Sequence, residues 1–406
     1  MTDYGDSSNY PEPTTEEFAQ FREWVDNPHE YGRNWKQRTD GDVVAFFCTY
    51  SPREIAYAAD ILPVRSYGGH QADEIAQADE HIFRGMWCPF SRDVLSQGIL
   101  GKYDYADGIM MASTCLHLRQ TYQSWEDHVL DDDDFAHYFM MPHGAQQQGG
   151  VSFLAEKLRE TASELEEYTG QEITDEDLWE AIEVYDENRR LLREVYQYRQ
   201  EDNPPISGLE ALEMVKSSHI ADPKEHNELL RNAVDKLEDY DGERRDPDYR
   251  LMHISSENDD RRFMYMVEED LPFDVTVVTE EACVGTRDFW NTTTDQYDDP
   301  FMALADRYLK RPPCPNKDWS DRHRMDQVEG LATDFDVDGA MIIMQKFCDP
   351  HQLDIPRERE LLEDEMDIET LTLEFDASVP IGQFKTRVEA FVEQLQTQQM
   401  DMDALY

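Results

Sequence analysis

The sequence predicts an α/β protein made of two doubly wound (Rossmann- or flavodoxin-like) parallel-sheet domains, with a helical insert and an N-terminal helical segment. Short, nearly continuous apolar runs alternate with amphipathic segments, which is typical of strands buried on both faces of a parallel sheet. The runs form two groups of four with a long helical region between them, as two α/β halves would. A length of 406 residues also exceeds one average domain of about 150 residues.

The first group of apolar runs follows a short N-terminal segment. We expect a frayed tail over roughly the first 13 residues and then a helix in "EEFAQFREWVDNP". The expected strands are 42–47 (DVVAFF), 62–67 (LPVRSY), 107–112 (DGIMMA) and 137–142 (HYFMMP). This pattern assigns 1–40 to the tail and helix and 41–150 to a first α/β domain.

Long amphipathic segments fill the middle of the chain. Three helices are expected, in "VSFLAEKLRETASELEEYTG", "DENRRLLREVYQYRQ" and "GLEALEMVKSS". We assign 151–240 to a helical insert associated with the first domain, because the stretch 237–250 is charged, turn-rich and without periodicity. Strands are expected again at 249–255, 273–279, 339–344 and 371–376, which gives a second α/β domain over 241–406.

The chain is strongly acidic, with 37 Lys and Arg against 89 Asp and Glu and a formal charge of −52. No general basic field is available for nucleic acid, so nucleic-acid binding is not expected. The acid is dispersed over periodic segments, and hydrophobic residues make up 39% of the chain, which favours a folded protein over a disordered one. Such self-repulsion is screened at molar salt, where the Debye length is about 3 Å. We therefore expect a halophilic protein of a salt-accumulating cytoplasm.

Targeting signals and disulfides are not expected. The start "MTDYGDSSNYPEP" lacks a basic and apolar leader, and no apolar run approaches the roughly 20 residues needed to cross a membrane. Six cysteines are too sparse for a disulfide scaffold, and a cytoplasmic setting would keep them reduced. They are structural thiols, catalytic thiols or metal ligands.

The positions of the cysteines favour a metal site. Cys88 precedes Pro89 at an expected helix start, where backbone N–H groups stabilise a thiolate. Four more follow expected strands, at the sheet edge where ligands bind: Cys48, Cys115, Cys283 and Cys348. Cys314 lies between prolines in "RPPCPNKDW". A single buried cysteine is most often a packing residue. Five near such edges favour metal ligation from separate loops, since no CxxC or close CxxCxxC spacing occurs.

Other polar motifs predict ordinary structural roles. The stretch "SENDD" at 256–260 is interpreted as a helix cap with first-turn carboxylates, and Asp349-Pro350 as a strand stop or helix start. Five histidines lie near expected strand or helix ends, where structural hydrogen bonding is the commoner role: His81, His117, His143, His253 and His351. No P-loop or GxGxxG element occurs, so any ATP used would be bound by another polypeptide.

Several blocks in order along the chain resemble a known family. They are "CTYSPREIAYAADILPVRSYGG", "MWCPFSRDVLSQGILGKYDYADGIMMASTCLHLRQTYQSW", "DNPPISGLEA", "RPPCPNKDW", "QKFCDPHQLDIP" and "FDASVPIGQFKTRVEAFVEQL". Together they are similar to the iron–sulfur subunits of the benzoyl-CoA reductase and 2-hydroxyacyl-CoA dehydratase family. The blocks around Cys115, Pro204 and Cys314 look closest to the smaller subunits of ATP-dependent benzoyl-CoA reductase.

The resemblance implies a [4Fe–4S] cluster held by Cys88, Cys115 and Cys348, in a crevice between the two halves. The fourth iron can be left open to water, hydroxide or substrate. Leu116 stands where many relatives have aspartate. No role follows for Cys48 or Cys283. Arg119, Lys346 and Arg387 are candidate partners for CoA phosphates.

The resemblance also implies partners and chemistry. The expected partners are a homologous second iron–sulfur subunit, ATP-hydrolysing activator subunits, a ferredoxin-type electron donor and an acyl-CoA substrate. The expected activity is reduction of benzoyl-CoA or a similar aromatic acyl-CoA by single-electron transfer through a ketyl-type radical. Dehydration of a 2-hydroxyacyl-CoA is the alternative. A third hypothesis, of another class, is a non-catalytic subunit that relays electrons or builds the complex.

Overall fold

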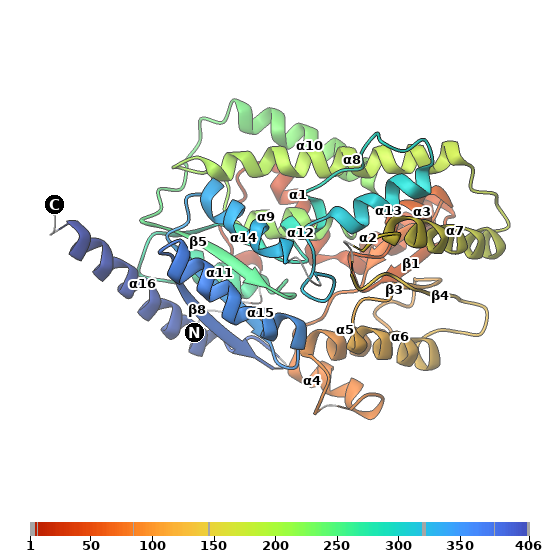
Figure 1. Ribbon diagram of the computed structural model, residues 1–406, viewed down its shortest axis with the longest axis horizontal. Helices are drawn as coiled ribbons and strands as arrows, with labels where there is room; N and C mark the ends of the chain where they lie inside the picture. The colour runs from red at the N-terminus through yellow and green to blue at the C-terminus, as the bar shows by residue number, and fades with distance from the viewer. Residues whose placement is uncertain are drawn as a thin grey trace.

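The chain folds around two four-stranded parallel sheets, as the sequence predicts (Figure 1). This computed structural model describes residues 5, 7–83, 85–144, 147–318, 322–376 and 378–403. The first sheet has the order β2-β1-β3-β4 and the second the order β6-β5-β7-β8. The first-sheet strands are β1 (Val43–Phe46), β2 (Leu62–Arg65), β3 (Gly108–Ala112) and β4 (Phe135–Phe139). The second-sheet strands are β5 (Tyr249–Ser255), β6 (Val275–Glu281), β7 (Gly339–Gln345) and β8 (Glu369–Phe375).

Burial explains why these runs form strands. Every residue of β1, β2, β3, β5, β6 and β7 is buried, which matches their continuous apolar character. The edge strands β4 and β8 are only partly covered. The strand bounds shift slightly from those expected, since β4 covers Phe135–Phe139 rather than 137–142 and β6 covers Val275–Glu281 rather than 273–279.

Helices surround both sheets. In the first part of the chain they are α1 (Glu16–Asp26), α2 (Pro28–Thr39), α3 (Arg53–Ala58), α4 (Ala72–Ile75), α5 (Pro89–Ile99) and α6 (Leu116–His128). The middle region holds α7 (Gly150–Thr169), α8 (Asp175–Gln197), α9 (Gly208–Ser217) and α10 (Pro223–Glu238). The later helices are α11 (Arg261–Glu269), α12 (Thr286–Phe289), α13 (Pro300–Lys310), α14 (His323–Asp334), α15 (Asp349–Arg359) and α16 (Ile381–Asp403). Short 3-10 or π turns cover Ser7–Asn9, Ala76–Glu80, Tyr198–Gln200 and Glu360–Glu365.

The middle helices pack on both halves. Helix α8 contacts α3 of the first half and α12 of the second, and it lies beside α10 (Figure 1). Buried ion pairs repeat this pattern, because Arg189 of α8 binds Glu54 of α3 and Arg199 binds Glu280 of β6. Helix α13, after the second sheet has begun, packs on α7. The sequence predicts three of these middle helices, and α10 is a fourth. The domain ranges given above remain a prediction.

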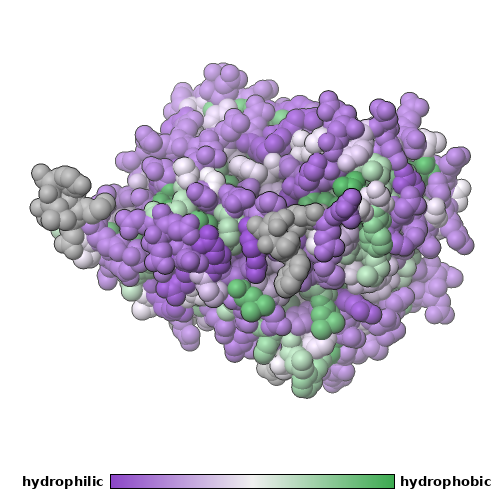
Figure 2. All heavy atoms as spheres, in the orientation of Figure 1, coloured by the Kyte–Doolittle hydropathy of each residue, from purple (hydrophilic) through white to green (hydrophobic). Residues whose placement is uncertain are grey.

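The described residues around Tyr10 lie against the folded chain, whereas the sequence predicts a frayed tail there. Tyr10 is buried and stacks on Tyr265, with ring centroids 5.1 Å apart. The backbone N–H of Thr14 donates to Glu210 at 2.7 Å. The face shown in Figure 2 is mostly hydrophilic, with a few apolar clusters. No helix in the described part of the chain is both long and apolar enough to span a bilayer.

Candidate iron–sulfur site

All six cysteines line one cavity of about 310 Å³. The cavity lies at the carboxyl ends of strands from both sheets, because its walls come from the segments after β1, β3, β5, β6 and β7. This is the sheet edge at which open α/β folds bind ligands. Aromatic and aliphatic side chains complete the wall: Phe47, Phe90, Leu116, Leu118 and Phe347.

The three expected ligands share one structural position. Cys88, Cys115 and Cys348 are the N-cap residues of α5, α6 and α15. Backbone N–H groups at a helix N-terminus lack helical partners and favour negative charge. Cys115 makes such a contact, because the backbone N–H of Leu118 donates a hydrogen bond to the Sγ of Cys115 at 3.4 Å. Three helix N-termini therefore meet at one cavity. The sequence predicts a helix start at Cys88 and allows one at Asp349-Pro350, but it predicts none at Cys115.

Burial opposes ionisation of these thiols. It raises the pKa of Cys88, and it raises the pKa of Cys115 and of Cys348 much further, with neighbouring thiols adding to the shift. A buried thiolate needs a compensating cation, and metal binding supplies one while releasing the thiol proton. The cavity is thus poorly suited to free thiolates and suited to metal-bound ones.

The turn before Cys348 is conformationally unusual. Strand β7 ends at Gln345, and Phe347 has a φ of 64°, in the left-handed region that aromatic residues rarely adopt. Such strain persists where the surrounding structure fixes it, and it is common at functional sites. Asp349 and Pro350 then form the first turn of α15. Of the two roles expected for this pair, the structure shows the helix start.

Glu257 is a functional candidate that the sequence interpretation missed. It lines the cavity and is buried, and its Oε2 accepts a 2.8 Å hydrogen bond from Arg65. Its Oε1 is buried and has no hydrogen-bond partner among the described residues. Burial raises the pKa of Glu257. A buried carboxyl with a raised pKa can hold a proton for transfer inside a cavity.

The "SENDD" interpretation is therefore only partly right. Asp260 is the N-cap of α11, and its side chain accepts from the N–H of Arg262. Glu257 and Asp259 precede the helix rather than lie in its first turn, and both are buried. The position of this polar run in the sequence could have indicated a functional role, because the run directly follows β5 at the carboxyl edge of the sheet.

Lys317 is a second missed residue. It is buried in the cavity wall, its Nζ donates to the carbonyl of Ser113 at 2.6 Å, and it forms no ion pair within the described residues. Burial lowers its pKa to about 8, while thiolates at Cys314, Cys48 and Cys115 would favour its protonated form. Lys317 therefore places an uncompensated positive charge beside the thiols.

Known proteins are similar to this chain over most of its length. The family described as 2-hydroxyglutaryl-CoA dehydratase, D-component, matches residues 48–395. The chain belongs to this family. It is 25% identical over 384 residues to the (R)-phenyllactyl-CoA dehydratase beta subunit of Clostridium sporogenes, covering 93% of this chain and 98% of that one. It is 23% identical over 331 residues to a benzoyl-CoA reductase subunit of Thauera aromatica, covering 80% and 83%.

Family membership supports an enzymatic role but leaves the reaction open. The (R)-2-hydroxyglutaryl-CoA dehydratase beta subunit of Acidaminococcus fermentans is 22% identical over 364 residues, covering 85% of this chain and 90% of that one. Dehydratase and reductase relatives therefore lie at similar distances from this family member. Sequence identity therefore does not assign this chain to the dehydratases or to the reductases.

The chemistry of the donor set suits an iron–sulfur cluster. The six thiols all line the cavity, and in an iron–sulfur cluster each cysteine thiolate binds a different iron. Across the described residues, no three His, Cys, Asp or Glu side chains form a group that could hold a single metal ion.

The remaining candidates have structural partners or lie elsewhere. The ring of His117 accepts from the N–H of Cys88 at 3.3 Å, and His351 lies 3.2 Å from Arg287. Lys346 pairs with Asp376 at 3.6 Å, and Arg387 donates to the carbonyl of Thr372 at 2.7 Å. Three further histidines do not line the cavity: His81, His143 and His253. Arg119 is exposed on α6.

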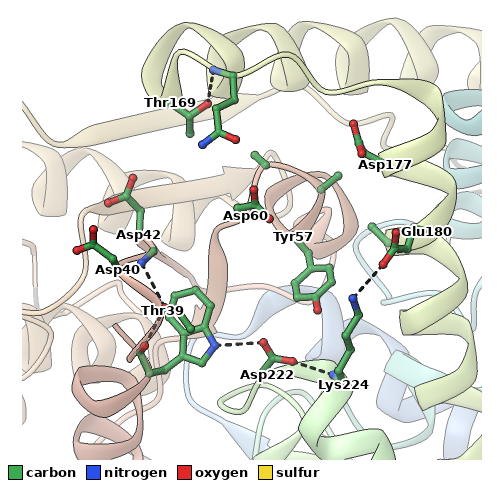
Figure 3. Close-up of a pocket in the computed structure, with 16 residues that line it drawn as sticks. Thr39, Asp40, Asp42, Tyr57, Asp60, Thr169, Asp177, Glu180, Asp222 and Lys224 are labelled. Atoms are coloured by element: carbon green, nitrogen blue, oxygen red, sulfur yellow. Dashed lines mark hydrogen bonds and ion pairs between the residues drawn. The ribbon is translucent and has the colours of Figure 1, made fainter. Parts of the chain in front are cut away.

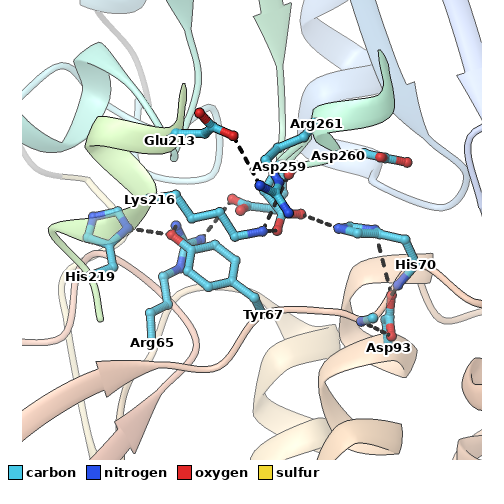
Figure 4. Close-up of polar contacts among 12 residues, drawn as sticks. Arg65, Tyr67, His70, Asp93, Glu213, Lys216, His219, Asp259, Asp260 and Arg261 are labelled. Carbon is cyan, nitrogen blue, oxygen red and sulfur yellow. Dashed lines mark hydrogen bonds and ion pairs between the residues drawn. The ribbon is translucent and has the colours of Figure 1, made fainter. Parts of the chain in front are cut away.

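Arg65, which lines the cavity, also belongs to a buried polar network (Figure 4). Tyr67 and His219 lie 2.5 Å apart, and His219 contacts Asp288 at 2.9 Å. Lys216 and His70 of the same network both bind Asp259, and His70 Nε2 lies 3.0 Å from Asp259 Oδ1. Burial alone would lower the pKa of His70, but the carboxylates around it raise the value to about 9. The network joins the loop after β2 to the loop after β5.

A separate cavity of about 490 Å³ has a different character (Figure 3). Six carboxylates line it, from Asp40, Asp42, Asp60, Asp177, Glu180 and Asp222, and Lys224 is the basic residue among its described lining residues. It contains no thiol. Mutual repulsion among these carboxylates should lower stability.

Proposed function

We propose that this chain is an iron–sulfur subunit of an ATP-dependent, low-potential acyl-CoA enzyme, with Cys88, Cys115 and Cys348 as ligands of a [4Fe–4S] cluster. The observation that carries the proposal is the meeting of these three thiols, each at a helix N-terminus, in one cavity of about 310 Å³. Cluster sulfides and thiolates are negatively charged, and helix N-termini and the Lys317 ammonium favour that charge.

The leading reaction is reduction of benzoyl-CoA or another aromatic acyl-CoA through a ketyl-type radical. When bound, the cluster supplies one electron at a time. The chain's own residues would exclude water and hold a proton for transfer. The rings of Phe47, Phe90 and Phe347 would exclude water from the cavity. Glu257 would hold a proton at Oε1, the oxygen that has no partner among the described residues.

Dehydration of a 2-hydroxyacyl-CoA is the second candidate. It is favoured by the dehydratase beta subunits among the relatives, one of which matches 93% of this chain. A reductase consumes electrons in proportion to product, whereas a dehydratase recycles the electron and needs it only to start. A subunit that only relays electrons or builds the complex would instead leave the acyl-CoA site to its partner.

The proposal requires other proteins. The described residues and the sequence offer no phosphate-binding loop, so ATP hydrolysis is assigned to separate activator subunits supplied by a ferredoxin-type donor. The relatives are subunits by name, and we propose a homologous iron–sulfur subunit as partner of this chain as well.

Electron counting with the assembled complex tests the reaction. The chain, its partner and the activator would be incubated anaerobically with ATP, a measured amount of reductant, and either benzoyl-CoA or an aromatic 2-hydroxyacyl-CoA. Product equal to half the electrons supplied, from benzoyl-CoA alone, is expected for the reductase. Dehydrated product in large excess over electrons would establish the dehydratase instead. Turnover that survives loss of all three cysteines here would leave only a structural role.

A further inference from the structure

Three cysteines in the cavity are not used by the proposed cluster. Cys48 follows β1, Cys283 follows β6, and Cys314 follows α13, so this second set also draws on both halves of the chain. Each is only partly buried, whereas packing thiols in a core are among the most completely buried groups. All six cysteines are free thiols. The second set therefore opens to the same space as the first.

The loops that carry Cys48 and Cys314 are tied together. Arg311 donates to the carbonyl of Thr49 at 2.6 Å and to its hydroxyl at 2.9 Å. The N–H of Cys314 donates to the hydroxyl of Tyr50 at 3.2 Å. These bonds join a loop of the first sheet to a loop more than 250 positions later, as their sequence separations of 262 and 264 residues show. Two thiols are thus held at a fixed spacing.

The loop that carries Cys283 is held as firmly. Arg287 donates to the carbonyl of Ser256 at 2.9 Å, and its Nε lies 3.2 Å from Glu281. Both partners belong to the second sheet or its edge, so Cys283 is fixed against the segment that carries Glu257. Metal ligands need supports of this kind, because a ligand that moves loses affinity. A thiol that only fills space needs none.

The positive charge of Lys317 also favours metal-bound thiolates in this part of the cavity. Lys317 places an ammonium among these thiols, and its partners within the described residues are the carbonyls of Ser113 and Met141. A buried cation without a counter-ion is costly, and metal-bound thiolates with their sulfides would provide one.

We infer that Cys48, Cys283 and Cys314 form a second thiolate ligand set, so that the cavity binds an iron–sulfur assembly through all six cysteines and holds more than one four-iron cluster. The inference rests on the proposed function and extends it. Each thiol loses its proton to solvent as its sulfur binds iron, and the iron and sulfide come from outside the chain.

Counting iron and sulfide per chain tests the inference. The wild-type chain would be reconstituted anaerobically with ferrous iron and sulfide, with native mass spectrometry to count both. We expect clearly more than the about four irons of one cluster. The triple variant C48S/C283S/C314S should fall to about four irons and change the Mössbauer spectrum. Met140→Ser, a change at an exposed position outside the cavity, should keep the wild-type count.

The outcomes separate the two proposals. About four irons in both the wild type and the triple variant would overturn the second ligand set and leave the proposed function intact. No iron in the folded wild-type chain would overturn both. If the triple variant does not fold by circular dichroism, the wild-type count alone decides, because about four irons contradicts the inference and a larger number supports it.

Discussion

The backbone N–H of Phe90 donates to Gln345 Oε1 at 3.1 Å, and this bond crosses from the first half of the chain to the second. Phe90 lies in the first turn of α5, two residues after the Cys88 cap, and Gln345 ends β7 three residues before Cys348. Gln345 Nε2 also donates to the carbonyl of Glu257 at 2.5 Å. One buried amide therefore fixes the spacing between thiols from different halves.

Replacing Gln345 with leucine should loosen the cavity. The change leaves a buried N–H and a buried carbonyl without their partner, which costs about 1–3 kcal/mol of unfolding free energy. We also expect reconstituted iron to be lost to a chelator several-fold faster. Urea unfolding and the decay of cluster absorbance measure the two effects. The exposed Gln383→Leu is the matched control. An unchanged rate of iron loss would show that this bond does not position the thiols.

The sequence predicts the sheets well because burial on both faces imposes an apolar pattern. All eight strands were expected, and the bounds differ only at ends such as those of β4 and β6. Helix α10 was missed. Its residues are polar on one face, and its apolar positions pair with α8, a contact that sequence alone does not reveal.

The site could be predicted only in part for a related reason. Strand ends mark which cysteines reach the sheet edge, so convergence of thiols was foreseeable. Cys115 and Cys348 cap α6 and α15 only because these helices begin at the next residue, and the first residue of a helix is hard to predict from sequence. Glu257 and Lys317 were missed, because a charged residue in an acidic chain looks solvated until its burial is known.

Removing the Lys317 charge should make the bound cluster harder to reduce. A nearby positive charge favours the reduced, more negative state, so Lys317→Met should lower the reduction potential and weaken cluster retention. Anaerobic redox titration monitored by electron paramagnetic resonance measures the shift. Lys310→Met is the control, since that lysine is exposed and pairs with Asp306 at 2.8 Å. A potential equal to the wild type's would mean that Lys317 does not act on the cluster.

His70 should make stability fall at alkaline pH. Its folded pKa of about 9 lies above the usual 6.5, so its stabilisation is complete below pH 6.5 and is lost as the pH rises through about 9. Because its side chain is 24% exposed, we expect about 2 kcal/mol rather than the full shift. His70→Asn, which suits the φ of 55°, should flatten urea-unfolding stability across this window.

A neighbouring histidine provides the control for this pH dependence. His29 and His70 both line a further cavity of about 320 Å³, but burial lowers the pKa of His29 to about 4. It stays neutral between pH 6.5 and 9, so His29→Asn should leave the slope of stability against pH unchanged there. Equal slopes for the wild type and His70→Asn would contradict the assignment.

Folding should depend on salt. With a net charge of −52, the isolated subunit should lose most of its native circular dichroism at about 0.1 M salt, where the Debye length is about 10 Å, and regain it at molar salt.

The carboxylate-lined cavity of Figure 3 allows a local test of the same repulsion. Asp60 lies there with a φ of 59°, which asparagine also tolerates. Asp60→Asn should raise the urea midpoint more at low salt than at about 2 M salt, because screening already removes the repulsion at molar salt. Lys224→Gln, which removes the cation paired with Glu180 at 2.9 Å, should act in the opposite direction. Full native structure at low salt, or equal effects of Asp60→Asn at both salt concentrations, would show that the acidic surface does not set stability.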